Sequence, residues 1–164
     1  MCNEKPYEIN MLRSWRDKKP VADELVKDLR SIDQFEIEGL GFTTQQGVVA
    51  SFYETTPVYV ARAKDSGRLM CCWGLQIIDG QDKMTYIIWA LGTDELERFK
   101  KTFVKDAKEI LDRWMDYYGE LTNTVAVCNI KSIRWLKSMG AKFENRRKIN
   151  DVEYIDFFLR KKEE

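Results

Sequence analysis

The sequence contains no histidine among its 164 residues. Histidine is the usual base of Ser-His and Cys-His triads and a frequent zinc ligand, so its absence excludes those triads and histidine acid–base catalysis. The four cysteines, Cys2, Cys71, Cys72 and Cys128, form no Cys-x-x-Cys pair. We therefore expect no metal site. The cysteines are interpreted as small buried apolar residues in a reducing compartment.

The sequence also lacks any apolar run close to the roughly 20 residues that a membrane-spanning helix needs. Residues 1–6 show neither the basic start nor the apolar stretch of a secretion signal. Basic and acidic residues balance at 27 each, so we expect no general attraction to nucleic acid. These absences predict a protein that is cytosolic or packaged from the cytosol, with no membrane span and no nucleic-acid partner.

The sequence does have enough apolar material for a core, since hydrophobic residues form 44% of the chain. Its length suits a single domain over residues 1–164, because domains usually hold roughly 100–200 residues. Apolar runs and alternation predict strands over residues 7–15, 58–62, 68–78, 84–91, 125–128, 142–148 and 152–159. Three- and four-residue spacing predicts helices from residue 20 towards residue 39 and over residues 44–53, 94–118 and 130–139. This order predicts an α/β domain with a mixed, mostly antiparallel central sheet flanked by helices.

Residues 129–143 form the most informative segment, in which Asn129 follows an apolar run and Gly140 ends a short helix. The segment resembles the pattern N-x-x-[AS]-x-x-x-Y-x-x-x-G-[FA] of the GNAT (N-acetyltransferase-like) superfamily, with Ser132 also matching. Leu136 stands where many active members carry a tyrosine. The predicted order of strands and helices is also that of the GNAT fold, so the resemblance implies this fold for most of the chain.

Within this superfamily the segment is most similar to the GNAT-like internal virion protein A family of short-tailed bacteriophages. That family shares the string Asn-x-x-x-Ile-Arg-[Phe/Trp]-Leu-Lys-[Ser/Thr]-[Ile/Met]-Gly-Ala, which residues 129–141 match here. The resemblance implies a phage-encoded protein that works in the host cytoplasm and that can be part of the virion. It also implies other phage or host proteins as partners.

In the acyltransferases, a loop resembling [QR]-x-x-G-x-[GA] precedes the long helix, and its amides hold the pyrophosphate of coenzyme A. Here Gly92 and Thr93 begin the corresponding segment, and three carboxylates follow within it. We expect Asp94 to cap the helix with Glu97 reciprocating, which would place negative charge where a pyrophosphate binds. No cofactor is therefore expected. If acetyl-CoA binds, Gly92, Thr93 and Asn129 are the expected contacts.

The missing tyrosine also affects the chemistry, because that tyrosine can protonate the leaving thiolate as a general acid and Leu136 cannot. Glu54, Asp79 and Asp82 could each serve as a general base, but nothing in the sequence distinguishes them from surface acids, so no catalytic residue is assigned. Trp15 and Trp135 are the candidates for partner binding, since exposed tryptophans often anchor interfaces. They could equally close the ends of the core.

Three hypotheses remain open from the sequence. The first is a GNAT-fold protein without standard acyl transfer, which binds other proteins in virion assembly or inside the virion. The second is an N-acetyltransferase that uses acetyl-CoA to modify a protein or a small amine, although a fold does not establish a function. The third is a factor that inhibits a protein of the bacterial host.

Overall fold

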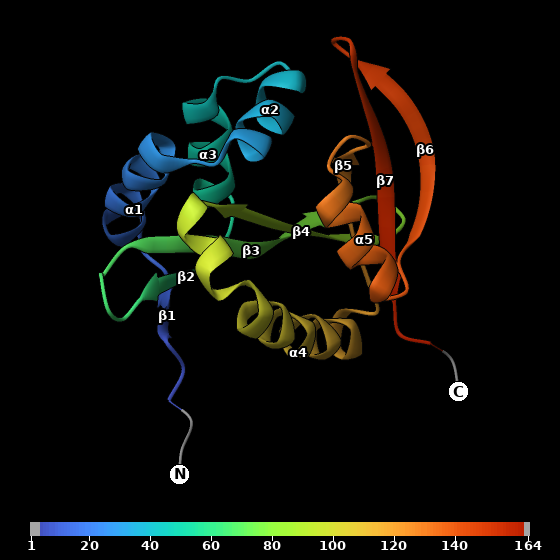
Figure 1. Ribbon diagram of the computed structural model, residues 1–164. Helices are drawn as coiled ribbons and strands as arrows, with labels where there is room; N and C mark the ends of the chain where they lie inside the picture. Colours follow the sequence, from blue (N-terminus) through green and yellow to red (C-terminus); the bar gives the residue numbers. More distant parts are fainter. Residues whose placement is uncertain (1–3, 163–164) are drawn as a thin grey trace.

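The computed structural model describes residues 4–162. Within them the chain forms one seven-stranded sheet with the strand order β1-β2-β3-β4-β5-β7-β6 (Figure 1). The strands are β1 (Tyr7–Leu12), β2 (Val58–Ala63), β3 (Leu69–Asp79), β4 (Met84–Gly92), β5 (Glu120–Ala126), β6 (Lys142–Ile149) and β7 (Val152–Arg160). Neighbouring strands are antiparallel except β4 and β5, which are parallel. The predicted mixed, mostly antiparallel sheet is confirmed.

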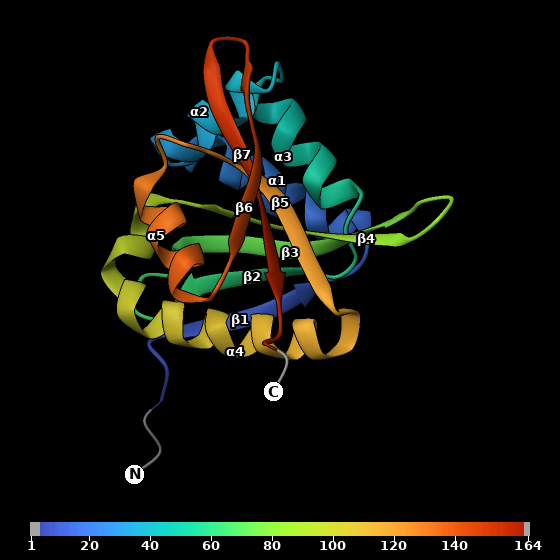
Figure 2. The same cartoon turned by 90° about the vertical axis from the view of Figure 1, so that its right-hand side faces the viewer.

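Helices cover both faces of this sheet (Figures 1 and 2). They are α1 (Trp15–Asp28), α2 (Ser31–Gly39), α3 (Thr44–Tyr53), the short 3₁₀ helix η1 (Asp94–Phe99), α4 (Lys100–Tyr118) and α5 (Ile130–Ser138). α1 and α3 pack on one face of β2 and β3. α4 packs on the opposite face, and α5 joins it over β5 and β7.

The central strand β3 is buried on both faces, as its continuous apolar run predicts. Its adjacent residues Cys71 and Cys72 point to opposite sides. Cys72 belongs to the core under α1 and α3, whereas Cys71 belongs to the core under α4. Cys128 departs from the expectation of burial, because β5 ends at Ala126 and Cys128 lies exposed in the turn that follows. Cys2 lies outside the described residues.

The helical stripe predicted from residue 20 towards residue 39 is wrong as a single helix. α1 begins at Trp15, a residue that the sequence places in the first strand, because the Ser14 side chain caps it by accepting from the Asp17 amide. α1 ends at Asp28, and α2 begins at Ser31. The extended backbone between them leaves the helical path and pairs with the end of β4.

Two helix starts follow the sequence closely. Thr43 and Gln46 form a reciprocal capping box at the start of α3, which satisfies two amides that a helix leaves unbonded. Asn129 caps α5 by accepting from the Ser132 amide. The predicted strand over residues 125–128 is placed too late, because the chain has already entered β5 at Glu120 and turns before Asn129.

Candidate functional site

Each of the parallel strands β4 and β5 leads to an expected coenzyme contact, with Gly92 and Thr93 at the end of β4 and Asn129 after the end of β5. The space between these two strand ends is called the gap below. Within the described chain, Ile87 and Thr122 form the single ladder pair that joins these strands. Next to it, the Asn123 side-chain amide donates to the Ile88 carbonyl over 2.6 Å. Beyond this point the strands diverge (Figure 2). β4 ends at Gly92, and Asn129 follows the end of β5.

The Gly92 side of the gap is occupied by the junction between α1 and α2. The Arg30 amide donates to the Gly92 carbonyl over 3.0 Å, and Leu29 forms an antiparallel bridge with Thr93. The Gly92 amide in turn donates to the Asp33 carboxylate over 2.8 Å. Both backbone groups of Gly92 are therefore satisfied by the protein.

The rest of this loop is also bonded internally. The Thr93 amide donates to the Met70 carbonyl over 3.0 Å, and the Leu96 amide donates to the Thr93 carbonyl over 3.2 Å. The Glu95 amide donates to the Thr93 hydroxyl over 3.2 Å. Between Gly92 and Leu96, every amide other than that of Asp94 thus has an acceptor within the described residues.

The predicted cap at this loop is wrong in its residue. Thr93 is the cap, because its backbone is still extended and its hydroxyl reaches the Glu95 amide, whereas Asp94 is already inside η1. Glu97 does not reach back to the cap but lies near Lys131 at 3.7 Å on the surface. The buried carboxylate at this helix start is Glu95, which pairs with Arg98.

An internal ion pair lies beside the loop. Asp33 is buried, with 4% of its surface exposed, and it receives two hydrogen bonds from the Arg30 guanidinium, at 2.7 and 3.2 Å. A β-carbon added to Gly92 would lie 3.4 Å from Arg30 Nε, so this glycine allows the guanidinium to approach closely. The Asp33 carboxylate accepts from the amide of Gly92, which ends β4 and immediately precedes the cap of η1. It thus uses an amide of the loop that the GNAT resemblance assigns to the pyrophosphate.

The Asn129 side of the gap is held by a second carboxylate of α2. Glu36 Oε1 accepts from the Asn129 side-chain amide over 2.7 Å and from the Ala126 amide over 3.3 Å. Burial raises the pKa of Glu36, and these two hydrogen bonds oppose the rise. Tyr154 of β7 is fully buried and donates its hydroxyl to the Glu36 carbonyl over 2.8 Å.

α2 therefore spans the gap through two side chains on one helical face. Asp33 and Glu36 are three residues apart, a spacing that places them on the same side of a helix. Asp33 holds the end of β4, and Glu36 holds the end of β5 and the start of α5. Figure 1 shows α2 beside the upper part of β5 and β7. The carboxylates of α2 therefore accept hydrogen bonds from backbone amides on both sides of the gap.

Sequence reasoning missed Arg30, just before α2, and the two α2 residues Asp33 and Glu36 that close the gap. Arg30, Asp33 and Glu36 recur at three-residue steps along the chain, which places ionisable groups along one face of a helix. The helix predicted in this region rests only on the apolar stripe of Val21, Leu25, Leu29 and Ile32. A row of charges facing the same side as the apolar residues was the available signal.

The other candidate acids lie away from the gap. Glu54 ends α3 and accepts from the Gln76 side chain over 2.9 Å. Asp79 and Asp82 lie exposed at the turn between β3 and β4, at the opposite end of β4 from Gly92. The structure does not bring any of the three to Asn129. Leu136 is buried in the core formed by α4, α5, β5 and β7 and carries no proton donor.

The two candidate tryptophans are half-buried and lie on different faces of the sheet. Trp15 packs against the core under α1 and α3, with its ring edge-to-face with Tyr53 at 5.5 Å between centroids. Trp135 packs against the core under α4 and α5. Each is therefore packed partly into a different core cluster, and their role in partner binding stays a prediction.

Two further observations concern the described chain, residues 4–162. None of its helices is long and apolar enough to cross a membrane. Its Cys, Asp and Glu side chains nowhere gather in groups of three or more that could hold a metal ion.

Comparison with known proteins identifies the fold. The ribosomal-protein-S5-alanine acetyltransferase of Vibrio fischeri superposes with a TM-score of 0.63 at 13% identity, covering 96% of this chain and 94% of that one. A GNAT-family acetyltransferase of Bacillus anthracis gives 0.60 at 15% identity, with 95% of both chains covered. Aminoglycoside N(6')-acetyltransferase of Legionella pneumophila gives 0.61 at 8% identity, covering 97% and 94%. The chain has the GNAT fold, as predicted.

A family comparison points to phage proteins. Residues 77–147 match the family described as "Bacteriophage T7, probable scaffold protein Gp13". No curated protein matches the sequence. The matched segment runs from the end of β3 through β4, α4, β5 and α5 into β6. The family similarity therefore covers part of the chain, whereas the fold similarity covers nearly all of it.

Proposed function

We propose that this protein is a phage-encoded GNAT-fold protein without acyl-transfer activity, which binds other proteins during virion assembly in the host cytoplasm or within the virion. The hydrogen bond from the Gly92 amide to the Asp33 carboxylate carries the first part of the proposal. The similarity of residues 77–147 to a phage scaffold family supports the second part. Leu136 in place of the tyrosine agrees with a protein that has no leaving thiolate to protonate.

Two anions, the Asp33 carboxylate and a coenzyme pyrophosphate, would compete for the same loop amides. A coenzyme pyrophosphate would need the loop amides that Asp33 and Thr93 already use. Freeing them breaks the contacts of Asp33 with Gly92 and Arg30, and a hydrogen bond to a charged group contributes about 1.5–3 kcal/mol. If Asp33 stayed in place, its charge would repel the pyrophosphate at short range in a poorly solvated site. Either route weakens coenzyme binding.

Calorimetry with acetyl-CoA tests the non-catalytic part. We expect no measurable heat of binding at near-millimolar ligand, with the purified full-length protein at neutral pH. Micromolar binding would overturn the proposal.

Mass spectrometry of purified virions and of assembly intermediates tests the assembly role, and we expect the protein in at least one of these samples. Its absence from both would contradict an assembly role.

The alternative function is acetyl-CoA-dependent N-acetylation of a protein or a small amine. The divergence of β4 and β5 beyond the pair of Ile87 and Thr122 favours it, because movement of α2 together with the α1–α2 junction would open the gap between them. In this case Gly92, Thr93 and Asn129 would contact the coenzyme. The same calorimetric titration decides between the two functions.

A further inference from the structure

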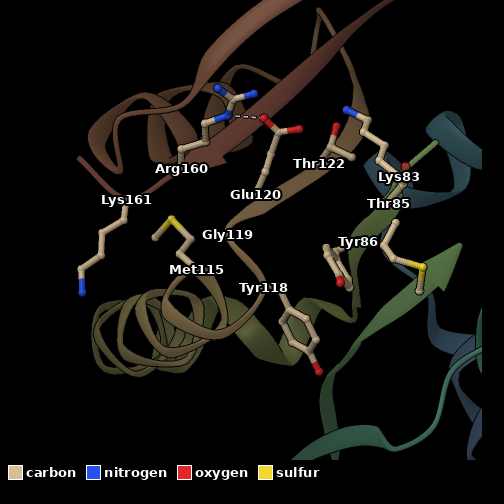
Figure 3. Close-up of a pocket in the computed structure, with 11 residues that line it drawn as sticks. Lys83, Thr85, Tyr86, Met115, Tyr118, Gly119, Glu120, Thr122, Arg160 and Lys161 are labelled. Atoms are coloured by element: carbon tan, nitrogen blue, oxygen red, sulfur yellow. Dashed lines mark hydrogen bonds and ion pairs between the residues drawn. The ribbon is translucent and has the colours of Figure 1, made fainter. Parts of the chain in front are cut away.

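A hollow of about 460 Å³ lies between the other ends of β4 and β5, away from the gap (Figure 3). Its walls come from the starts of β4 and β5, the end of α4 and the end of β7. It lies on the opposite side of the pair of Ile87 and Thr122 from the gap that α2 closes. The hollow is therefore separate from the candidate coenzyme site.

Aromatic and apolar side chains form the floor of the hollow and extend beyond it. Tyr86 and Tyr118 lie with their ring centroids 4.6 Å apart, and Tyr117 contacts Tyr118 at 4.8 Å. Tyr117 is 82% exposed, and Met84 and Ile77 are also exposed. Ile77 is the cross-strand neighbour of Tyr86, so it lies on the same face of the sheet. Tyrosine and methionine are enriched in the cores of protein interfaces.

The rim of the hollow carries a small excess of positive charge. Lys83, Arg160 and Lys161 line it together with a single carboxylate, Glu120. Arg160 donates its Nε to Glu120, while its two terminal nitrogens make no hydrogen bond to the described residues. Lys161 pairs with Asp116. Lys83 has no ion pair with any residue of the described chain.

The backbone beside the hollow offers a further binding element. From Met84 to Tyr86, β4 pairs with β3 on one side, and no strand among residues 4–162 pairs with its other side. An extended segment can add hydrogen bonds to such an edge while its alternate side chains enter adjoining pockets. Shape, apolar floor and positive rim thus favour the same kind of ligand.

We propose that this hollow binds an extended acidic segment of a partner protein. Glutamate or aspartate side chains pair with Lys83 and Arg160, and an apolar or aromatic side chain packs over Met84, Tyr86 and Tyr118. This inference rests on the proposed function as a protein-binding component of phage assembly. The segment similar to the phage scaffold family begins at residue 77, so it includes the aromatic floor.

Titration of the ¹⁵N-labelled full-length protein with a capped heptapeptide tests the inference. The peptide alternates glutamate with leucine and phenylalanine, and a matched peptide carries glutamine at each glutamate position. We expect amide shifts confined to residues 83–86, 117–122 and 160–161, with tighter binding of the acidic peptide. No shifts at millimolar peptide, shifts centred elsewhere, or equal binding of both peptides would overturn the inference.

A pair of charge-reversal variants separates local from general electrostatics. Lys83→Glu removes a rim cation, while Lys101→Glu makes the same change in net charge at the exposed start of α4, at the opposite end of that helix from the hollow. We expect Lys83→Glu to weaken the acidic peptide about fivefold to tenfold, with little effect of Lys101→Glu. Equal weakening in both variants would overturn the inference.

The inference and the proposed function fail separately. If the wild-type protein is present in virions or assembly intermediates but the peptide does not bind the hollow, the inference alone falls. If the protein is absent from those particles, the assembly function falls whatever the peptide does. Incorporation of the Lys83→Glu protein at wild-type levels, with Lys101→Glu as control, would also count against the hollow as the docking site.

Discussion

The Asp33 carboxylate accepts a hydrogen bond from the Gly92 amide over 2.8 Å, although the two residues are 59 positions apart in the sequence. Asp33 is buried and also pairs with Arg30 at 2.7 Å. Through this contact α2 is attached to the glycine at which the GNAT resemblance places the coenzyme phosphate. The Asp33 side chain therefore attaches α2 to the sheet and also uses an amide of the candidate cofactor site.

Replacement of Asp33 by alanine should strongly destabilise the protein. It leaves the Gly92 amide without its acceptor and the Arg30 guanidinium without its partner. We expect a loss of about 2–4 kcal/mol in the free energy of unfolding, measured by urea denaturation. Asp33→Asn keeps an acceptor oxygen and should lose less.

The control for this change is Asp23→Ala on α1. Asp23 pairs with Lys19 at 2.8 Å, but both side chains are about half exposed, so the loss should be about 0.5 kcal/mol or less. If Asp33→Ala costs no more than this control, the contact with Gly92 does not hold α2 in place.

The pH dependence of stability should reveal the partly buried Glu36. Burial raises its pKa above the ordinary glutamate value, so its ionisation opposes folding. The contribution of the protonated group is present below the ordinary pKa of about 4.3 and is lost as the pH rises through the raised folded pKa. As the pH rises from the ordinary pKa through the raised folded pKa, we expect the wild type to lose stability relative to Glu36→Gln. Glutamine keeps the acceptor for Asn129 but does not ionise.

Parallel urea denaturation at a series of pH values between about 4 and 7.5 measures this difference. Asp33 and Arg30 also face Glu36 and are unchanged in the variant, so their contributions largely cancel. Glu38→Gln, on the exposed side of α2, is the matched control. A difference between wild type and Glu36→Gln that stays constant with pH would contradict the expectation.

The sequence predicted the sheet and most helices because their apolar periodicity is local. The Asn129 cap and the Thr43 capping box also depend on residues within one helical turn. The break between α1 and α2 could not be predicted in this way, since Val21, Leu25, Leu29 and Ile32 continue one helical stripe through it. The extended Leu29 is fixed by its bridge to Thr93, which is a tertiary contact.

In the candidate site, too, the features set by nearby residues could be predicted and those set by tertiary contacts could not. The single glycine and the acids after it were visible in the sequence, and they predicted an unfavourable loop for pyrophosphate. The residue that accepts from Gly92 was not visible, because Asp33 comes from a different helix and only the folded chain brings the two together. The cap changed from Asp94 to Thr93 for a local reason, since the helical turn begins one residue earlier than expected.

Restoring the tyrosine of the family pattern should destabilise the protein. Leu136 is 3% exposed and packs in the core between α5, β5 and β7, so Leu136→Tyr introduces extra volume and a buried hydroxyl. We expect a loss of about 1–3 kcal/mol from overpacking. Leu136→Met, which nearly conserves volume, should lose less than about 1.5 kcal/mol. Thermal or urea denaturation compares them, and equal stability of wild type and Leu136→Tyr would mean that this position opens towards the gap.

The cysteines should differ sharply in reactivity. Burial raises the pKa of Cys71 to about 12 and also raises that of Cys72, and both thiols lie in the core. Cys128 is exposed after β5. Because the thiolate is the reactive form, we expect Ellman's reagent at pH 8 to modify Cys128 rapidly in the folded protein and the other two only after denaturation.

The test uses a Cys2→Ser background, since Cys2 lies outside the described residues, and Cys128→Ser in that background should abolish the rapid reaction. A second rapidly reacting thiol in the folded Cys2→Ser protein would contradict the expectation, since it would mean that Cys71 or Cys72 becomes accessible in solution. We do not expect this result, because the two thiols are buried in cores on opposite faces of the sheet.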